Sequence, residues 1–543
     1  MGLVKTYGSA LCGVRAFTVT IEVSAGNGVG FFLVGLPDVA VKESQQRMDA
    51  ALSCSGYRMP GRKIIINMAP ADVRKEGSAY DLPLAVAILA ASGQISASLN
   101  PSAMLMGELS LDGGVQPIRG VLPIALQARA DGFKQLIIPA ANVEEASVVE
   151  GLDVYGFASL QEVVGFLQGG PAPPAPPTGR IQSLYSGGDV PDLTDVCGQE
   201  HVRRAMEVAV AGGHNLLMIG PPGTGKTMLA RRIPGIMPPM DMDEALETTA
   251  IHSVGGHLSP RTGLIYARPF RAPHHTISAV AMMGGGAVAR PGEVSLAHNG
   301  VLFLDELPEF PRSVLEALRQ PLEERTVRIV RARYGAEFPA GFMLVAAMNP
   351  CPCGYYGHPD KACVCTPGEV QRYRNRISGP LLDRIDLHVE MSPLTFEVLS
   401  RPTPSESSAA VRERVVRART FQQQRFSSGA SGSNSYTGIT SSGIVSSGCD
   451  VNSHALPAHA VHIHTVHTNA AMPAVLIRRF CTPDAAGRAL LGAAMNRLGL
   501  SARAYDRILK LARTIADLDG SEQVRAPHIA EAIQYRCLDR KRG

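Results

Sequence analysis

One octapeptide constrains this chain more than any other feature. Residues 216–219 form the short apolar run Leu-Leu-Met-Ile, and the next eight residues read Gly-Pro-Pro-Gly-Thr-Gly-Lys-Thr. A stretch with helical character, residues 228–232, follows directly. This is the phosphate-binding pattern G-x-x-x-x-G-K-T in its strand–loop–helix setting, where backbone N–H groups and a helix N-terminus converge on phosphate. The pattern predicts an α/β domain built on a parallel sheet.

Two adjacent carboxylates follow this P-loop after about 80 residues, at the end of the apolar run 301–304. Because α/β sheets bind ligands at the carboxyl ends of their strands, we expect Asp305 to hold Mg²⁺ and Glu306 to orient and polarise the attacking water. Lys226 is expected to reach the β- and γ-phosphates of ATP, and Thr227 to ligate Mg²⁺. The residues expected to bind the nucleotide and its metal are Gly220, Pro221, Pro222, Gly223, Thr224, Gly225, Lys226, Thr227 and Asp305.

Three further segments carry polar residues suited to ATP hydrolysis. The apolar run 342–348 ends at Asn349 and resembles the sensor-1 strand of AAA+ ATPases, although an Asn before Pro350 also suits a plain turn. The segment 379–387 resembles the arginine-finger segment of that superfamily, which makes Arg384 the candidate finger; local pairing with Asp383 or Asp386 is the alternative. The segment 500–507 resembles the start of a sensor-2 helix, with Arg503 as the candidate and Arg507, one turn later, as its rival. The catalytic set is therefore Glu306, Asn349, Arg384 and Arg503.

The order of these segments, together with residues 268–276 and 291–298, resembles the magnesium-chelatase-like branch of AAA+ proteins. That resemblance implies an insertion in the second helix that projects toward a ring pore, and Gly284, Gly285 and Gly286 suit a mobile loop there. Residues 72–83 and 106–139 resemble the Lon protease domain. With the cysteine-rich patch described below, nearly the whole chain outside residues 427–467 resembles the competence protein ComM family.

Membership of that family implies a fold, partners and an activity. The fold is an α+β Lon-protease-like domain (ribosomal S5 domain 2-like) followed by an α/β AAA+ core with a helical lid. The implied activity is a hexameric DNA helicase that drives branch migration during natural transformation. The implied partners are single-stranded and branched DNA, other copies of this chain, and a recombinase or other recombination proteins.

The Lon resemblance does not extend to protease chemistry. Alignment on the Lon motifs places Ala79 where a nucleophilic Ser belongs, with Ser78 one position away, and Ile124 where the Lys base belongs. Without a base, a serine hydroxyl is a poor nucleophile. We therefore predict that this domain does not cleave peptides.

Four cysteines form a C-x-C-x₉-C-x-C pattern, namely Cys351, Cys353, Cys363 and Cys365. Four thiolates suit tetrahedral Zn²⁺, so we expect a zinc site that braces the loop after Asn349. The spacing departs from the usual C-x₂-C knuckle, and free thiols in a loop are the alternative. His358 is a possible substitute ligand.

Changes in composition and a Pro/Gly-rich segment divide the chain into four parts. Residues 1–168 are expected to form the Lon-like domain, and the Pro/Gly-rich stretch 169–189 a stiff linker. Residues 190–393 form the ATPase core with its cysteine loop 351–365, and residues 394–543 the lid, interrupted by a flexible insertion at 427–468. Within these parts we expect strands at 14–23 and 63–68, and helices at 39–54, 81–91, 483–498, 502–518 and 527–538. Thr482 and Ser501 are the expected N-caps of two lid helices.

Charge and cysteine content limit the remaining possibilities. The net charge is only +4, so any DNA-binding surface must be local, with Arg261, Arg268, Arg271 and Arg290 as candidates and plain solvation as the default for each. No apolar run of about 20 residues and no secretory signal is found, and ten cysteines in such a chain favour a reducing compartment, so we expect a cytoplasmic protein without a membrane span. Two other functions stay open: a chelatase-type motor, and an ATP-dependent unfoldase or protease.

Overall fold

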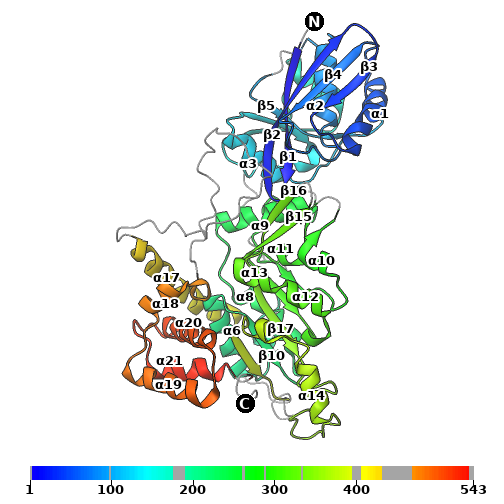
Figure 1. Cartoon of the computed structure of the whole chain (residues 1–543). Coiled ribbons are helices and arrows are strands. Elements are labelled where there is room, and N and C mark those ends of the chain that lie inside the picture. Colours follow the sequence, from blue (N-terminus) through cyan, green and yellow to red (C-terminus); the bar gives the residue numbers. More distant parts are fainter. Residues whose placement is uncertain are drawn as a thin grey trace.

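The structure, a computed structural model, describes residues 3–96, 100–174, 190–259, 263–286, 289–331, 334–393, 405–430, 468–536 and residue 538. An N-terminal domain lies at one end of the molecule, an ATPase core in the middle, and a group of helices, the lid, beside the core (Figure 1). Most of the predicted linker, most of the predicted insertion, and Arg261 lie outside the described residues. None of the helices described is both long and apolar enough to cross a membrane.

The N-terminal domain is an α+β fold, as predicted. Its main sheet has the order β1-β2-β4-β3. Alternating side chains of β2 face the core, with Val19, Ile21 and Val23 fully buried, and the two predicted helices occur with the predicted bounds. The elements of this sheet and its helices are β1 Leu3–Cys12, β2 Arg15–Gly26, β3 Gly30–Val34, β4 Lys63–Ala69, α1 Val39–Cys54 and α2 Asp81–Ala91.

A smaller parallel sheet of three strands, in the order β5-β8-β9, completes this domain. The strands are β5 Ala103–Leu105, β8 Gln135–Pro139 and β9 Asp153–Phe157, and the helices beside them are α3 Val121–Ala130, α4 Val143–Ala146 and α5 Leu160–Leu167.

The ATPase core contains the predicted parallel sheet, with the order β11-β14-β17-β10-β18. Side chains of β10 alternate between two apolar clusters, Leu216 and Met218 on one face and Leu217 and Ile219 on the other. A strand buried on both faces reads as a continuous apolar run, which is why this strand and the strands at 301–304 and 343–348 were recognisable in the sequence. The strands are β10 Leu216–Ile219, β11 Phe270–Arg271, β14 Val301–Leu304, β17 Met343–Met348 and β18 Leu387–Glu390.

Helices flank this sheet, and the core contains two hairpins, the second of which lies next to the N-terminal domain (Figure 1). The flanking helices are α6 Glu200–Gly212, α7 Lys226–Ala230, α12 Arg312–Ala317 and α13 Arg319–Glu324, whereas α9 (Met242–Gly255) packs against α3 of the N-terminal domain. In the first hairpin α10 (Ala279–Met283) leads into β12 (Gly284–Gly285), which pairs with β13 (Arg290–Pro291), so two of the three glycines expected in a mobile loop lie in a strand. The second hairpin, β15 (Thr326–Arg331) with β16 (Tyr334–Pro339), was not predicted.

The lid consists of α17 Ser408–Ala430, α18 Ala474–Phe480, α19 Ala485–Leu498, α20 Ala502–Leu518 and α21 Ala526–Gln534. Helix α17 was not predicted, and it continues to Ala430, past the predicted start of the insertion at 427. Ser501 caps α20 as expected, because its hydroxyl accepts a hydrogen bond from the Ala504 N–H at 3.2 Å. The predicted cap Thr482 was wrong: Asp484 caps α19 by accepting from the Gly487 N–H at 2.7 Å.

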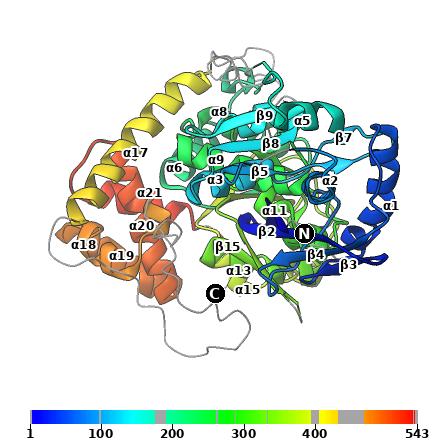
Figure 2. The same ribbon diagram turned by 90° about the horizontal axis from the view of Figure 1, so that it is seen from above.

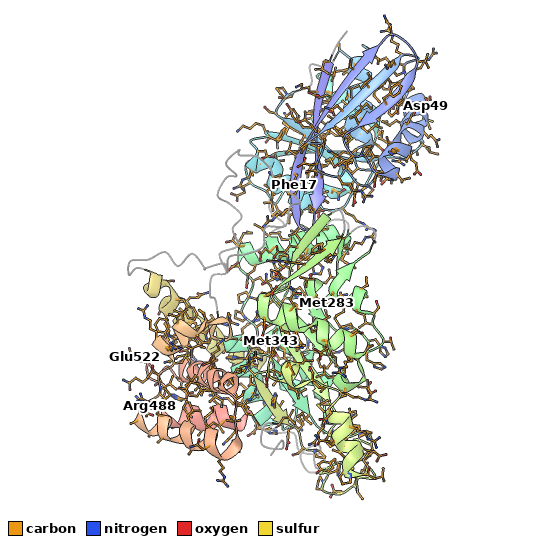
Figure 3. The ribbon with its side chains drawn as sticks, in the orientation of Figure 1. Phe17, Asp49, Met283, Met343, Arg488 and Glu522 are labelled. Atoms are coloured by element: carbon orange, nitrogen blue, oxygen red, sulfur yellow. The ribbon has the colours of Figure 1, made fainter. Side chains whose placement is uncertain are left out.

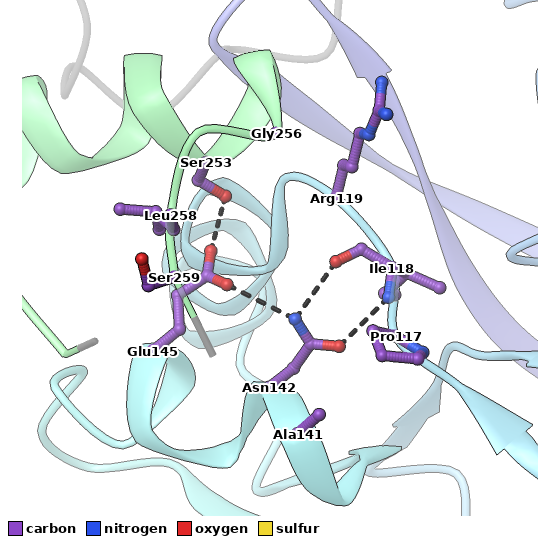
Figure 4. Close-up of a pocket in the computed structure, with 10 residues that line it drawn as sticks. All are labelled: Pro117, Ile118, Arg119, Ala141, Asn142, Glu145, Ser253, Gly256, Leu258 and Ser259. Atoms are coloured by element: carbon purple, nitrogen blue, oxygen red, sulfur yellow. Dashed lines mark hydrogen bonds between the residues drawn. The ribbon is translucent and has the colours of Figure 1, made fainter. Parts of the chain in front are cut away.

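Among the described residues, the N-terminal domain contacts the core at two places, and Figure 2 shows the molecule from above. The β1–β2 hairpin, near whose end Phe17 lies (Figure 3), reaches β16, where the Cys12 thiol donates to the Gly335 carbonyl at 3.4 Å. At the second place, Ser253 of α9 donates to the buried carboxylate of Glu145 (Figure 4). A pocket of about 210 Å³ lies beside this pair.

Candidate functional site

The P-loop connects β10 to α7, so its glycines lie beneath the N-terminus of a helix. Gly223 and Gly225 have φ values of +81° and +87°, in the left-handed region where a Cβ is strained. Such a loop turns its N–H groups inward, which suits it to phosphate. The expected nucleotide-binding residues 220–227 therefore form the loop at the carboxyl end of β10 and the start of α7.

Lys226 has its charge buried without an anionic partner. Its Nζ donates to the carbonyls of Gly220 at 2.7 Å and Pro221 at 2.9 Å, and to Oδ1 of Asn349 at 3.1 Å. Among the described residues it forms no ion pair. Burial lowers the pKa of Lys226, an effect that the charges of Asp305 and Glu306 oppose. A buried ammonium held only by neutral oxygens fits a bound phosphate group as its missing counterion.

The two carboxylates predicted for the site lie beside the P-loop, at the end of β14. The Thr227 hydroxyl donates to Oδ2 of Asp305 at 2.6 Å, so these two predicted Mg²⁺ ligands are already adjacent. Hydroxyl and carboxylate oxygens are the ligands that Mg²⁺ prefers, so the residues present fit the ion. Glu306 has a φ of +52°, which is uncommon for a residue with a side chain and is often found at functional sites.

A pocket of about 280 Å³ adjoins these carboxylates, and its far wall was not predicted as part of the site. That wall includes His274 and His275, whose ring centroids are 4.0 Å apart. His275 Nδ1 lies 3.3 Å from Oε2 of Glu306. Residues 268–276 carried only the family resemblance in the sequence, although two consecutive histidines just after a strand are a signal for chemistry.

Asn349 lies where the sensor-1 resemblance placed it, at the carboxyl end of β17 and in contact with Lys226. Strand β17 runs between β10 and β14. Its last residues therefore lie between the P-loop and the two carboxylates.

The side chain of Arg384 is bound to residues of its own chain. Its side chain pairs with Glu323 of α13 and donates to the Pro380 carbonyl at 2.6 Å, and the residue is 7% exposed. Its carboxylate partner is therefore neither Asp383 nor Asp386, the two that local pairing predicted. The finger role stays a prediction that requires this arginine to leave Glu323.

The two candidate sensor-2 arginines have different environments. Arg503, the first choice, lies exposed in the first turn of α20. Arg507 forms an ion pair with the buried carboxylate of Asp386. Arg507 thus ties the lid to the core, and Arg503 is the one with a side chain open to solvent.

The four predicted zinc ligands gather at one point. The sulfurs of Cys351, Cys353, Cys363 and Cys365 all lie within 4.8 Å of one another. The Cys351–Cys353, Cys353–Cys363 and Cys351–Cys363 sulfurs are 3.3, 3.6 and 3.7 Å apart, close to the roughly 3.8 Å edge of a tetrahedron with Zn–S bonds of about 2.3 Å. His358 is outside this cluster, and its Nδ1 accepts from the N–H groups of Asp360 and Lys361.

The cysteine loop also touches the P-loop. Gly354, with a φ of +85°, comes so close to Pro222 that a Cβ on it would lie 2.7 Å from the proline Cδ. The thiol pKa values in the loop separate: a hydrogen bond from the Tyr355 N–H lowers the pKa of Cys353 to about 6. The backbone N–H of Cys353 donates to Cys365, which lowers the pKa of that thiol. Burial and the neighbouring sulfurs outweigh this effect and raise the pKa of Cys365 to about 12.

The positions aligned with the Lon dyad carry no reactive group. Ile124 is a buried member of one apolar cluster, and Ala79 packs against the same cluster. The nearby Lys75 is fully buried, and its ammonium donates to the Pro70 carbonyl.

Two of the arginines offered as DNA contacts are engaged within the core. Arg268 pairs with Glu244 at 2.7 Å, and Arg271 pairs with Glu293 at 2.7 Å. Both arginines therefore form ion pairs with glutamates of the core, whereas the sequence predicted either contact with DNA or exposure to solvent. Arg290, in β13, is exposed.

Three family models match successive stretches of the chain. Models described as "Subunit ChlI of Mg-chelatase", "Magnesium chelatase, subunit ChlI" and "Magnesium chelatase, subunit ChlI C-terminal" match residues 19–142, 192–399 and 405–536. "Competence protein ComM" of Haemophilus influenzae is 44% identical over 545 residues, covering 99% of this chain and 98% of that protein. YifB of Escherichia coli is 42% identical over 544 residues, with the same coverage. "Lon protease 2" of Bacillus subtilis is 27% identical over 194 residues, which cover 29% of this chain and 32% of that protein.

These matches confirm the family and the fold class predicted from the sequence. They agree with a P-loop, adjacent carboxylates and a parallel sheet of the AAA+ type. The chain therefore belongs to the ComM and YifB family of magnesium-chelatase-like AAA+ ATPases.

Proposed function

We propose that this chain forms a hexameric ring that hydrolyses ATP to move along DNA in the cytoplasm. In this proposal the ring drives branch migration when incoming single-stranded DNA recombines with the chromosome during natural transformation. The observation that carries the proposal is full-length similarity to a protein named for competence. A recombinase that pairs the incoming strand is the expected upstream partner.

In this proposal, phosphate binding, metal binding and activation of water are assigned to different residues of the site, and the positions of these residues support the assignment. Lys226 would exchange its carbonyl partners for phosphate oxygens, and Thr227 and Asp305 would hold Mg²⁺. Bound Mg²⁺·ATP supplies the phosphoryl group to be transferred and a cation that offsets its charge. Glu306 would orient the water and accept its proton, with Asn349 helping to place that water.

The arginines complete the site in this proposal. Arg503, exposed on the lid, would reach the γ-phosphate of its own chain, and Arg384 would serve the site of the neighbouring chain. Each site is then shared between two chains, which is why the proposal requires a ring.

We further propose that the four-cysteine cluster holds one structural Zn²⁺. The sulfur spacings support tetrahedral coordination, and a site with four protein ligands is closed, as in structural zinc sites. Because the loop lies against Pro222 and follows Asn349 by two residues, the metal would brace the P-loop and the end of β17 together.

Two other functions compete with DNA translocation. A chelatase-type motor is favoured by the matching family models, and an unfoldase by the Lon similarity. Peptide cleavage is disfavoured because Ala79 and Ile124 supply neither nucleophile nor base.

One assay separates these functions. ATP turnover of the purified chain is measured with a forked or four-way DNA, with single-stranded DNA, and with an unfolded protein, alongside migration of the branched DNA. The proposal expects DNA to stimulate turnover and the branch to move only with ATP, with Glu306→Gln as the inactive control. If DNA leaves both binding and hydrolysis unchanged, the DNA function is wrong.

A further inference from the structure

Residues 384–388, here called the 384–388 segment, are fixed to the core through Asn215, which precedes β10. The Asn215 side-chain Nδ2 donates to the carbonyl of Arg384 at 2.9 Å. The Asn215 carbonyl accepts from the N–H groups of Asp386 at 3.1 Å and Leu387 at 3.0 Å. Because β10 leads into the P-loop, the segment that carries Arg384 is anchored to the strand that carries the nucleotide site.

The lid holds the same segment from the other side. Arg507 of α20 forms an ion pair with Asp386. After α21, Arg536 donates to the Ile385 carbonyl at 2.8 Å, and the Tyr535 carbonyl accepts from the His388 N–H at 2.7 Å. Two separate parts of the lid, α20 and the residues after α21, therefore contact three residues of the 384–388 segment: Ile385, Asp386 and His388.

Asp386 is the point where these contacts meet. One carboxylate oxygen faces Arg507, and the other lies 3.2 Å from His214 Nδ1 and 3.3 Å from the Asn215 N–H. The other ring nitrogen of His214 lies 2.9 Å from the Thr514 hydroxyl, which returns the chain of contacts to α20. Burial alone would raise the pKa of Asp386, but Arg507 and His214 outweigh it and hold this pKa well below its usual range.

A buried and fully partnered carboxylate of this kind fixes geometry. Removing one partner leaves the other charge uncompensated, so the lid helix and the 384–388 segment cannot easily move independently. Arg384 begins this segment, two residues before Asp386, so its place depends on the lid as well as on the core anchor at Asn215.

We propose that Asp386 is a positioning residue through which the lid of each chain sets the place of its own Arg384. The inference rests on the proposed ring, in which Arg384 completes the site of the next chain. A lid that responds to the nucleotide of its own chain would then align the arginine that acts on the neighbour's nucleotide. The nucleotide bound to one chain would then affect hydrolysis in the next chain, the one whose site receives the first chain's Arg384, and the effect would run in that direction alone.

Rings mixed from two variants test this coupling, because they reveal which site a defect affects. Arg507→Gln removes the lid's charge from Asp386 and, if Arg384 is misplaced by about 1 Å, should lower turnover by roughly 10²-fold. Mixed with Lys226→Ala, the variant should recover activity, because its intact P-loop meets a well-placed Arg384 from the other chain. Mixed with Arg384→Ala, it should not recover, because the Arg384 that it supplies is misplaced.

If Arg507 instead acts on the nucleotide of its own chain, Arg507→Gln should recover activity when it is mixed with Arg384→Ala and should not recover when it is mixed with Lys226→Ala. That result overturns the proposal. Arg503→Gln is the matched control, one turn earlier on α20, and is expected to show this opposite pattern. Full turnover of Arg507→Gln also overturns it.

A separate mixture distinguishes failure of the coupling from failure of the ring. If Lys226→Ala and Arg384→Ala do not restore activity to each other, the shared site itself is wrong. Asp386→Asn, which keeps the shape of the side chain, is tested in the same mixtures in case Arg507→Gln does not fold, as judged by its thermal unfolding. Recovery of Asp386→Asn with Lys226→Ala alone supports the coupling, and recovery with Arg384→Ala alone refutes it.

Discussion

The Nζ atom of Lys226 lies 3.1 Å from Oδ1 of Asn349, so the P-loop and the end of β17 share a hydrogen bond across 123 positions of sequence. Thr227, next to Lys226, donates a hydrogen bond to Asp305, which follows β14, the strand on the far side of β17 from β10. Four polar residues from three strands or their loops therefore converge before any ligand is considered. This convergence supplies the first prediction.

Lys226→Ala should abolish ATP binding or turnover, because no other cation of the P-loop can meet the phosphates. Glu306→Gln should bind ATP but hydrolyse it slowly, since the amide cannot accept a proton from water, and a loss of about 10²-fold or more is expected. Nucleotide affinity and steady-state turnover are measured for both. Near-wild-type turnover in Glu306→Gln would remove that residue from its assigned role.

His275→Ala should lower kcat about tenfold and leave the KM for ATP nearly unchanged, because Glu306 loses the neighbour that orients its carboxylate. His274→Ala is the matched control, since His274 Nδ1 contacts the Thr276 hydroxyl instead of the carboxylate. Steady-state kinetics of both variants measure the difference. Equal losses in the two variants would mean that the histidine pair has only a packing role.

Metal analysis of the purified chain should find about one Zn²⁺ per chain, and Cys363→Ser/Cys365→Ser should lose it. Because Gly354 packs on Pro222, the same variant should raise the KM for ATP by about tenfold. Cys54→Ser, which alters an exposed thiol outside the cluster, should change neither quantity. A folded wild type without metal would contradict the zinc proposal.

The sequence predicted those parts of the molecule whose residues act locally. Continuous apolar runs identified β10, β14 and β17, and Ser501 was recognised as a cap because a hydroxyl before a helix satisfies its first N–H groups. The cap of α19 was misplaced because Asp484 and Thr482 are both good caps, and only the chain path after Pro483 selects between them.

Contacts between distant segments were beyond the sequence. Glu323 as the partner of Arg384, His275 beside Glu306, and Gly354 against Pro222 each join residues that no local pattern links. The β15–β16 hairpin has a local signal, because Val327 and Ile329 alternate with more exposed residues, and a period of two residues is typical of a strand.

The junction between the N-terminal domain and the core should respond to pH through Glu145. Burial raises the pKa of Glu145, although hydrogen bonds from Ser253 and the Leu122 N–H oppose the effect. The folded state therefore favours the protonated form, so this residue's contribution to stability is fully present below its ordinary pKa of 4.5 and falls as pH rises through the raised value.

Glu145→Gln removes this dependence. The thermal unfolding midpoint of the variant, relative to wild type, should therefore increase as pH rises from about 4 to 8. Glu144→Gln controls for loss of one negative charge at the adjacent position. A difference between Glu145→Gln and wild type that stays constant over this range would show that Glu145 does not titrate there.

The last prediction concerns how Arg384 leaves its stowed position. In the single chain, Glu323 holds the guanidinium, whereas the proposed ring requires the same group to reach a neighbour's γ-phosphate. Glu323, with its side chain 57% exposed, would therefore compete with that phosphate for one cation.

Arg384→Ala should keep ATP binding and lose turnover, by as much as about 10³-fold given the usual worth of an arginine finger. Glu323→Gln should raise turnover at low protein concentration, because it removes the carboxylate that holds the Arg384 guanidinium. ATP should also assemble rings of this variant at a lower concentration of chain. Mass photometry with and without ATP measures assembly, and Glu324→Gln, at the adjacent position, is the matched control. Single chains only, in the presence of ATP and DNA, or full turnover of Arg384→Ala, would exclude a site shared between chains.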